Sequence, residues 1–278
     1  MSRLRRLWTS FLVEPLRRID REQREFLARP ESQNPDWKLM AVLITAALVL
    51  TLQHYFGGGP EVYYLPALFE KYGLDDLAGE FQDFLANPAN HEIAHGLYWS
   101  FFSFATYFFI PWFVIVIVFG KSLTEFGCKL RGAFKDWCIY IAFFTVMWTL
   151  LIWVSTHRHF QQTYPFYKLK SGEPLWPYFW LWEASYFLQF IGLEFFFRGF
   201  MVHGMKHRFG IYAIFVMAVP YCMIHFGKPF LETCGAFIAG VVLGFMSLKT
   251  RSIWLGAAIH MSVALSMDML SLWRQGRF

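Results

Sequence analysis

The sequence predicts an all-α, polytopic membrane helix bundle with about seven spanning helices and an N-terminal amphipathic interfacial helix. Of its 278 residues, 56% are hydrophobic and 21% are aromatic, and the mean hydropathy is +0.35, which is too apolar for a typical soluble domain. Long apolar runs also recur, and most approach or reach the ~20 residues that cross the hydrocarbon core as a helix. These runs are 39–56, 97–119, 137–155, 176–200, 210–226, 231–248 and 253–273.

The first element is the segment 1–38, which we expect to lie on the cytoplasmic side. Within residues 3–26, apolar side chains stand at helical spacing with arginines between them. This pattern is typical of an amphipathic helix on the inner leaflet, with anionic membrane lipid as its partner. A helix packed on the protein's own inner loops fits the same pattern. The first long apolar run begins only at Leu39, so no cleavable signal peptide is predicted.

The charge of the chain is unevenly distributed and predicts its orientation. The formal net charge is +5. Arginines crowd the N-terminus, whereas the connection 61–92 carries seven acidic residues against one lysine, Lys71. Because positive charge near span ends stays cytoplasmic, we expect a bacterial inner (cytoplasmic) membrane protein with its N-terminus inside. The basic residues follow topology and form no soluble basic face, which argues against nucleic acid as a partner.

The next predicted part, 39–155, comprises three spanning helices and an extracytoplasmic cap at 57–96. A breaker run of three glycines and a proline opens the cap at Gly57. The segments 65–72 and 75–85 then have the composition of short helices. We therefore expect a small folded cap between the first two spans.

The end of this cap contains a metal-binding pattern, His91-Glu92-Ile93-Ala94-His95. On a helix, His91 and His95 stand on one face and can share a zinc ion while Glu92 activates its water. The pattern predicts His91 and His95 as candidate metal ligands, although the sequence places no third ligand. A solvated first helical turn, with Glu92 near the positive end of the helix dipole, accounts for the same residue pattern without a metal.

The last predicted part, 156–278, carries ionisable residues inside apolar runs. These are Glu194, Arg198, His225 and His260. Each ionisable side chain at the bilayer centre costs roughly 2.5–3.5 kcal/mol by insertion scales. We therefore expect them to share an enclosed polar site. Polar contacts that only hold helices together are the alternative.

Helix geometry supports a shared site. Glu194 and His225 lie about fifteen residues on either side of the predicted turn at 208–210, so at ~1.5 Å per residue they reach a similar height. His260 lies above the next inner turn and can enter the same layer. Glu194 and Arg198 are spaced i, i+4 with the acid first, the better order for a helical ion pair.

Other residues of this part are expected to have structural roles. The small residues Ala236, Gly240 and Gly244 form a stripe that predicts close approach of a neighbouring helix. Glu183 precedes Glu194 by three turns, and we expect it to be solvated near the outer interface. Tyr221 is interpreted as a packing residue.

The order of these motifs resembles the CPBP family of intramembrane proteases, which includes CAAX-processing endopeptidases and bacteriocin-processing proteins. The similarity spans about 176–268, roughly a third of the chain. It implies that 156–278 is a catalytic membrane domain that cleaves a peptide or a prenylated or membrane-bound protein with activated water. The implied base pair is Glu194 with His225, while His260 polarises the carbonyl and Arg198 orients the glutamate. No cofactor is required by this resemblance, although zinc is possible.

The chain departs from the family pattern at two positions. Leu193 replaces the first of two adjacent glutamates, and Ala264 replaces an asparagine that donates to the oxyanion. Glu232 and Asp268 are nearby carboxylates that could support the site instead. Two other functions therefore stay open: a zinc metalloprotease centred on residues 91–95, and an inactive scaffold that binds a peptide or lipid.

Overall fold

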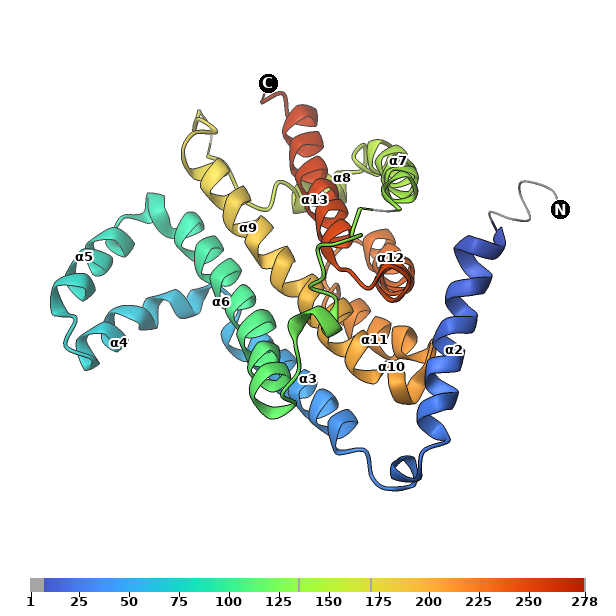
Figure 1. The fold of residues 1–278 in the computed structure, drawn as a ribbon. Coiled ribbons are helices and arrows are strands. Elements are labelled where there is room, and N and C mark those ends of the chain that lie inside the picture. Colours follow the sequence, from blue (N-terminus) through green and yellow to red (C-terminus); the bar gives the residue numbers. More distant parts are fainter. Residues whose placement is uncertain (1–7, 135, 171, 278) are drawn as a thin grey trace. The chain divides into compact units, whose positions relative to one another are not determined.

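The computed structural model describes residues 8–134, 136–170 and 172–277 (Figure 1). The part of the amphipathic pattern that precedes Trp8, with its arginines at 3, 5 and 6, lies outside the described residues. The described chain is helical, apart from an isolated bridge between Cys128 and Ser252. The predicted all-α class is thus confirmed.

The main helices follow one another with short connections. They are α2 (Glu14–Leu27), α3 (Trp37–Phe56), α4 (Leu65–Lys71), α5 (Asp75–Ala86), α6 (His91–Phe113), α7 (Trp137–Val154), α8 (Arg158–Thr163), α9 (Tyr178–Glu194), α10 (His203–Phe209), α11 (Tyr212–Met223), α12 (Phe230–Thr250) and α13 (Trp254–Arg274). Three π-helical segments join them: η1 (Thr9–Val13), η5 (Val114–Val118) and η7 (Phe195–Val202).

Five helical segments are long and apolar enough to cross a bilayer, so the chain is an integral membrane protein. Two other predicted runs take different forms. The run 176–200 becomes α9 followed by the π-helix η7, and the run 210–226 becomes α11, which has only 12 residues. The five segments are Trp37–Phe56, Pro88–Val118, Trp137–Val154, Phe230–Thr250 and Trp254–Arg274.

The chain divides into two compact units, each assembled from three separated stretches. Unit 1 comprises 1–47, 110–146 and 194–260, and unit 2 comprises 48–109, 147–193 and 261–278. The division falls within α3, α6, α7, α9 and α13. The parts expected from the sequence, with boundaries after residues 38 and 155, are continuous stretches of chain, and these boundaries stay a prediction.

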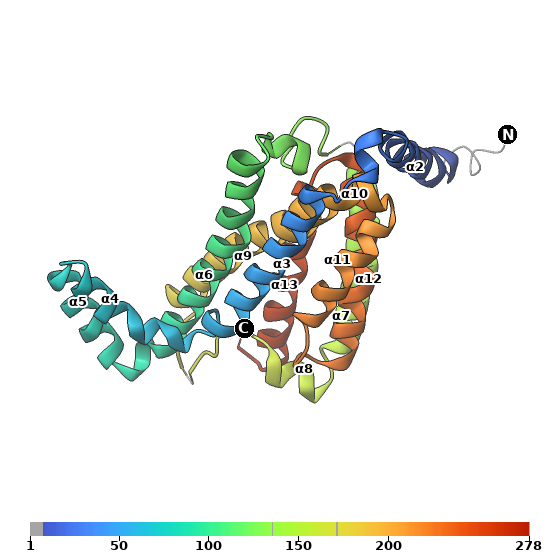
Figure 2. The same cartoon turned by 90° about the horizontal axis from the view of Figure 1, so that it is seen from below.

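Unit 1 is built around the close packing of α11 and α12, which run side by side (Figure 2). A Cβ atom on Gly240 would lie 3.0 Å from the Tyr221 ring, and one on Gly244 would lie 2.9 Å from Ile214. Only a glycine leaves room for this approach. The predicted small-residue stripe is therefore confirmed.

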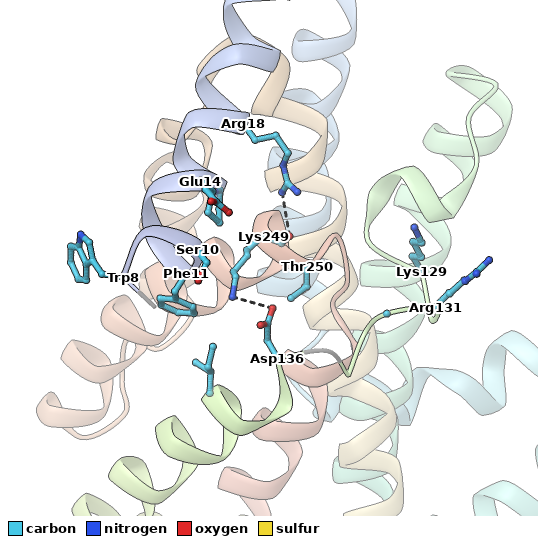
Figure 3. A pocket seen from close by; sticks show the side chains of 13 residues that line it. Trp8, Ser10, Phe11, Glu14, Arg18, Lys129, Arg131, Asp136, Lys249 and Thr250 are labelled. Carbon is cyan, nitrogen blue, oxygen red and sulfur yellow. Dashed lines mark hydrogen bonds and ion pairs between the residues drawn. The ribbon is translucent and has the colours of Figure 1, made fainter. Parts of the chain in front are cut away.

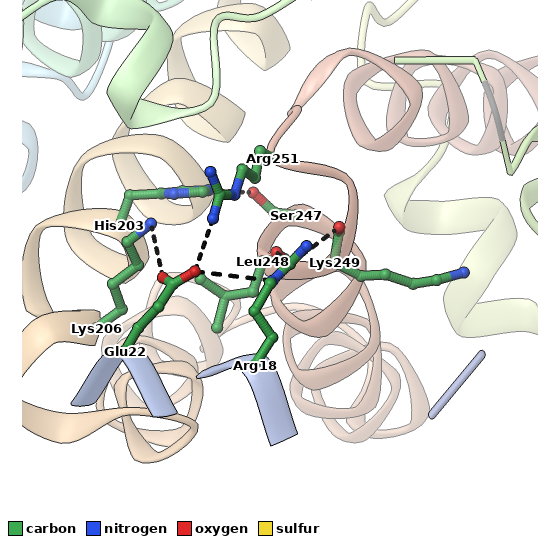
Figure 4. Close-up of polar contacts among 8 residues, drawn as sticks. All are labelled: Arg18, Glu22, His203, Lys206, Ser247, Leu248, Lys249 and Arg251. Atoms are coloured by element: carbon green, nitrogen blue, oxygen red, sulfur yellow. Dashed lines mark hydrogen bonds and ion pairs between the residues drawn. The ribbon is translucent and has the colours of Figure 1, made fainter. Parts of the chain in front are cut away.

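An ionic cluster joins helix α2 to the rest of unit 1 (Figure 4). The Glu22 carboxylate lies 2.6 Å from the Arg251 guanidinium and 3.9 Å from the Lys206 ammonium. Arg18 donates to the Leu248 carbonyl at 2.7 Å, at the carbonyl end of α12 where a cation is favoured. Pro15 and Ile19 are buried. Helix α2 packs beside α10 (Figure 1), as expected for a helix that packs on the protein. The expected contact with anionic lipid stays a prediction.

Unit 2 has an aromatic core and a helical cap. Phe179, Trp182 and Tyr186 of α9 are buried in one cluster with Ile93 of α6. Gly96 permits this contact, since a Cβ atom there would lie 2.6 Å from the Trp182 ring. Helices α4 and α5 pack on each other as a hairpin (Figure 1), which confirms the two predicted short helices; the extracytoplasmic position of the cap stays a prediction.

The glycine stripe gives a test of packing in unit 1. We expect Gly244→Leu to destabilise the protein by about 1–3 kcal/mol, because the new side chain overlaps Ile214. Gly235→Leu on the same helix is the matched control, since a Cβ atom there meets nothing within 4 Å. Thermal unfolding in detergent measures the difference. Equal losses in both variants would contradict the assigned packing.

Candidate functional site

The site begins where regular helix gives way to a π-helix. Helix α9 ends at Glu194, and η7 (Phe195–Val202) continues from it with all eight residues buried. A π-helical turn is rare and is often found at functional sites, because it shifts side chains away from their regular helical positions. Here it carries Arg198 inside unit 1.

Three ionisable side chains meet on one carboxylate. Glu194 Oε1 lies 3.0 Å from Arg198 Nη1 and 3.0 Å from His260 Nδ1. The Glu194 and Arg198 side chains are both 0% exposed, whereas the His260 side chain is 15% exposed. An unpaired buried charge is strongly destabilising, so each member of this group depends on the others. The predicted i, i+4 ion pair is confirmed.

The second oxygen of this carboxylate faces backbone. Glu194 Oε2 is buried and forms no hydrogen bond with any described residue. A Cβ atom on Gly256 of α13 would lie 3.1 Å from it. The missing side chain at Gly256 thus lets α13 approach closely enough for His260 to reach the other oxygen.

Tyr221 connects the two imidazoles, a role that sequence analysis missed. The Arg198 guanidinium lies 3.8 Å from the centroid of its ring, a cation–π contact in a buried setting. The ring centroids of His225 and His260 lie 4.9 and 6.3 Å away. The available signal was its position one turn before His225 on the same helix face.

His225 is held by the chain around it. The His225 Nδ1 lies 2.8 Å from the Tyr221 carbonyl, and Thr233 Oγ1 donates to the His225 carbonyl at 2.9 Å. A carbonyl only accepts, so Nδ1 carries the proton and Nε2 is the acceptor of the neutral ring. The hydrogen bond to Glu194 comes from His260, whereas the family resemblance led us to expect His225 as the glutamate's partner.

The predicted supporting carboxylates have other contacts. Glu232 forms an ion pair with Lys228 at 3.0 Å at the start of α12. Asp268 belongs to unit 2, where its Oδ1 accepts from the Phe166 backbone N–H at 3.1 Å. Their supporting roles stay predictions.

Unit 2 contains a buried pair of acids. The carboxyl groups of Glu183 and Asp268 are close enough to interact, and the two residues are 2% and 0% exposed. The expectation that Glu183 is solvated is therefore wrong. Packing of the aromatic residues of α9 encloses it, which sequence position alone did not indicate.

The His91 and His95 rings stack in parallel with their centroids 6.4 Å apart, and Tyr63 packs edge-on against both. His91 Nε2 lies 2.9 Å from the Leu85 carbonyl, so a metal bound there would have to displace this hydrogen bond. Across 8–134, 136–170 and 172–277, no group of three His, Cys, Asp or Glu side chains could hold a metal ion. The predicted zinc pair therefore stays a prediction that these contacts do not favour.

Residues 174–266 match the family model of the type II CAAX prenyl endopeptidase Rce1-like proteins. The matched segment contains Glu194, Arg198, His225 and His260. This match, over about a third of the chain, is a similarity to the CPBP and CAAX group of intramembrane proteases. Neither the curated proteins nor the solved structures include a match to this chain.

The acid pair of unit 2 gives a second test. Two carboxyl groups in contact cannot both ionise away from water, so we expect them to share one proton. Glu183→Gln should then leave stability unchanged, because an amide can donate to Asp268 as a protonated acid does. Glu183→Ala should lower it by roughly 1–3 kcal/mol, because Asp268 loses its partner. Thermal unfolding in detergent compares them, and equal losses would argue against a shared proton.

Proposed function

We propose that this protein, through its CAAX-type intramembrane protease segment at 174–266, is an endopeptidase that hydrolyses a peptide bond with activated water. The observation that carries the proposal is the contact of the buried Glu194 carboxylate with the partly exposed His260 imidazole. A carboxylate with no exposed surface cannot meet water directly. The imidazole beside it can.

The geometry suggests how the water is activated. The Glu194 carboxylate pairs with Arg198 and accepts a hydrogen bond from His260 Nδ1. The neutral His260 ring then presents Nε2 as the proton acceptor. His260 takes a proton from water as the oxygen attacks the scissile carbonyl, and Glu194 stabilises the imidazolium that forms. In this proposal Glu194 positions the base, and His260 is the base.

The remaining members have complementary roles. Tyr221 packs on the Arg198 guanidinium and fixes its direction toward Glu194. His225 is fixed by the Tyr221 carbonyl, so that its Nε2 is the atom available to the reaction. We assign it the orientation of the attacking water, because Nε2 can accept a hydrogen bond from that water. The leaving amine takes its proton from the His260 imidazolium, which thereby returns to the neutral ring. No cofactor enters these steps.

The substrate we propose is a peptide or a prenylated or membrane-bound protein, cleaved at the bilayer. This follows from the family of the matched segment and from spans that can hold the site within a membrane. The charge distribution supports an N-terminus on the cytoplasmic side. The membrane that we propose is a bacterial inner membrane. Anionic lipid is the proposed partner of the N-terminal segment.

A second candidate function is a catalytically inactive scaffold that binds a peptide or lipid. Two departures from the family pattern favour it. Leu193 and Ala264 are 4% and 5% exposed, and Ala264 packs in the aromatic cluster of unit 2. Neither can donate a hydrogen bond to an oxyanion.

Activity measurements decide between these functions. We expect Glu194→Gln and His260→Gln each to reduce cleavage of a prenylated peptide at least about 100-fold, as loss of a general base does. Glu125→Gln is the control, because Glu125 is exposed and pairs with Lys121 away from these side chains. Cleavage should resist a chelator and survive His91→Ala; chelator sensitivity would favour the zinc protease. Wild-type protein that binds but never cleaves would favour the scaffold.

Gly256 provides a subtler test of the same contact. We expect Gly256→Ala to lower kcat about tenfold or more, because its Cβ atom presses on Glu194 Oε2 and tilts the carboxylate away from His260. The variant should still fold and bind substrate, so KM should change little. Unchanged kcat would show that the alignment of this pair does not limit the reaction.

A further inference from the structure

A large cavity lies in unit 1, apart from the side chains assigned to peptide cleavage. Its volume is about 1020 Å³, which is large enough to hold a sizeable ligand. Figure 3 shows Trp8 and Phe11 from the N-terminal helix on one side and the loop of Lys129 and Arg131 on the other. The end of α12 contributes Lys249.

The cavity lies at the depth where spanning helices end. Asp136 immediately precedes the span Trp137–Val154, and Lys249 and Thr250 close the span Phe230–Thr250. Residues at span ends face the headgroup region of a bilayer. A ligand of this cavity therefore comes from the membrane interface.

Its charges are arranged for an anion. Four cations and two carboxylates line it, and two of the cations are already engaged. Lys249 pairs with Asp136 at 3.0 Å and lies over the Phe11 ring, while Arg18 donates to the carbonyl end of α12. Lys129 and Arg131 are exposed, and neither has an ion pair or hydrogen bond with any residue that the structure describes.

Apolar side chains also line the cavity. Trp8 is 61% exposed, and Phe11 and Ile139 add an aromatic and an aliphatic side chain. A free phosphate ion would make no apolar contact with these side chains. A phospholipid headgroup satisfies both parts, because its phosphate meets the cations and its glycerol and upper acyl chain meet the apolar residues.

We propose that this cavity binds the headgroup of an anionic phospholipid, with Lys129 and Arg131 as the phosphate ligands. The Glu22 cluster that ties α2 to unit 1 holds one wall of the cavity in place. Bound lipid would then join α2 to the loop before α7. The proposal is independent of peptide cleavage.

The test uses the full chain in detergent and counts bound lipid by native mass spectrometry. We expect phosphatidylglycerol to bind and phosphatidylcholine to bind much more weakly. The double variant Lys129→Gln, Arg131→Gln should weaken phosphatidylglycerol binding about 30-fold, from ~1 kcal/mol for each cation near an anionic surface. Unchanged thermal unfolding in phosphatidylcholine confirms that the double variant folds.

The matched control removes one lysine and one arginine outside both the cavity and the N-terminal segment. Lys71 and Arg158 are exposed and do not line the cavity, so Lys71→Gln, Arg158→Gln changes the net charge equally. It should retain phosphatidylglycerol binding. Equal losses in both double variants would overturn the proposal in favour of general surface attraction. Glycerol 3-phosphate that binds as tightly as phosphatidylglycerol would overturn the lipid as the source of the phosphate.

Discussion

The site is organised by the burial of one carboxyl group beside a cation. Glu194 has no exposed surface, and a charge so placed is tolerated only with a cation and hydrogen-bond donors around it. Arg198 supplies the cation from the same helical segment, and His260 supplies a donor from α13. The π-helix η7 and the cation–π contact with Tyr221 both hold the arginine where this carboxylate requires it.

Small residues make these contacts possible. Gly240 and Gly244 bring α12 against α11, and Gly256 brings α13 against Glu194. A membrane interior offers little hydrophobic drive for helices to associate, so close backbone approach and interhelical polar contacts take its place. The glycines that pack unit 1 thus also set the distance between the carboxylate and its imidazole.

The two units solve the problem of a buried acid in different ways. In unit 1 an arginine pairs with Glu194, whereas in unit 2 Glu183 and Asp268 face each other. A cation keeps a carboxylate charged and able to orient a base, while a shared proton removes the charge. The acid that pairs with arginine is the one in the proposed hydrolysis, whereas the two acids of unit 2 link α9 and α13 within that unit.

The sequence by itself determined the all-α membrane class, because long apolar runs leave no other structure able to satisfy the backbone in a bilayer. It also determined the Glu194–Arg198 pair and the glycine stripe, since i, i+4 spacing fixes a helix face. Only the tertiary structure decided that His260 contacts Glu194, that Tyr221 belongs to the site and that Glu183 is buried. Periodicity gives the face and height of a residue on its own helix. Which neighbouring side chain meets that face depends on the rotation and approach of another helix, which packing sets.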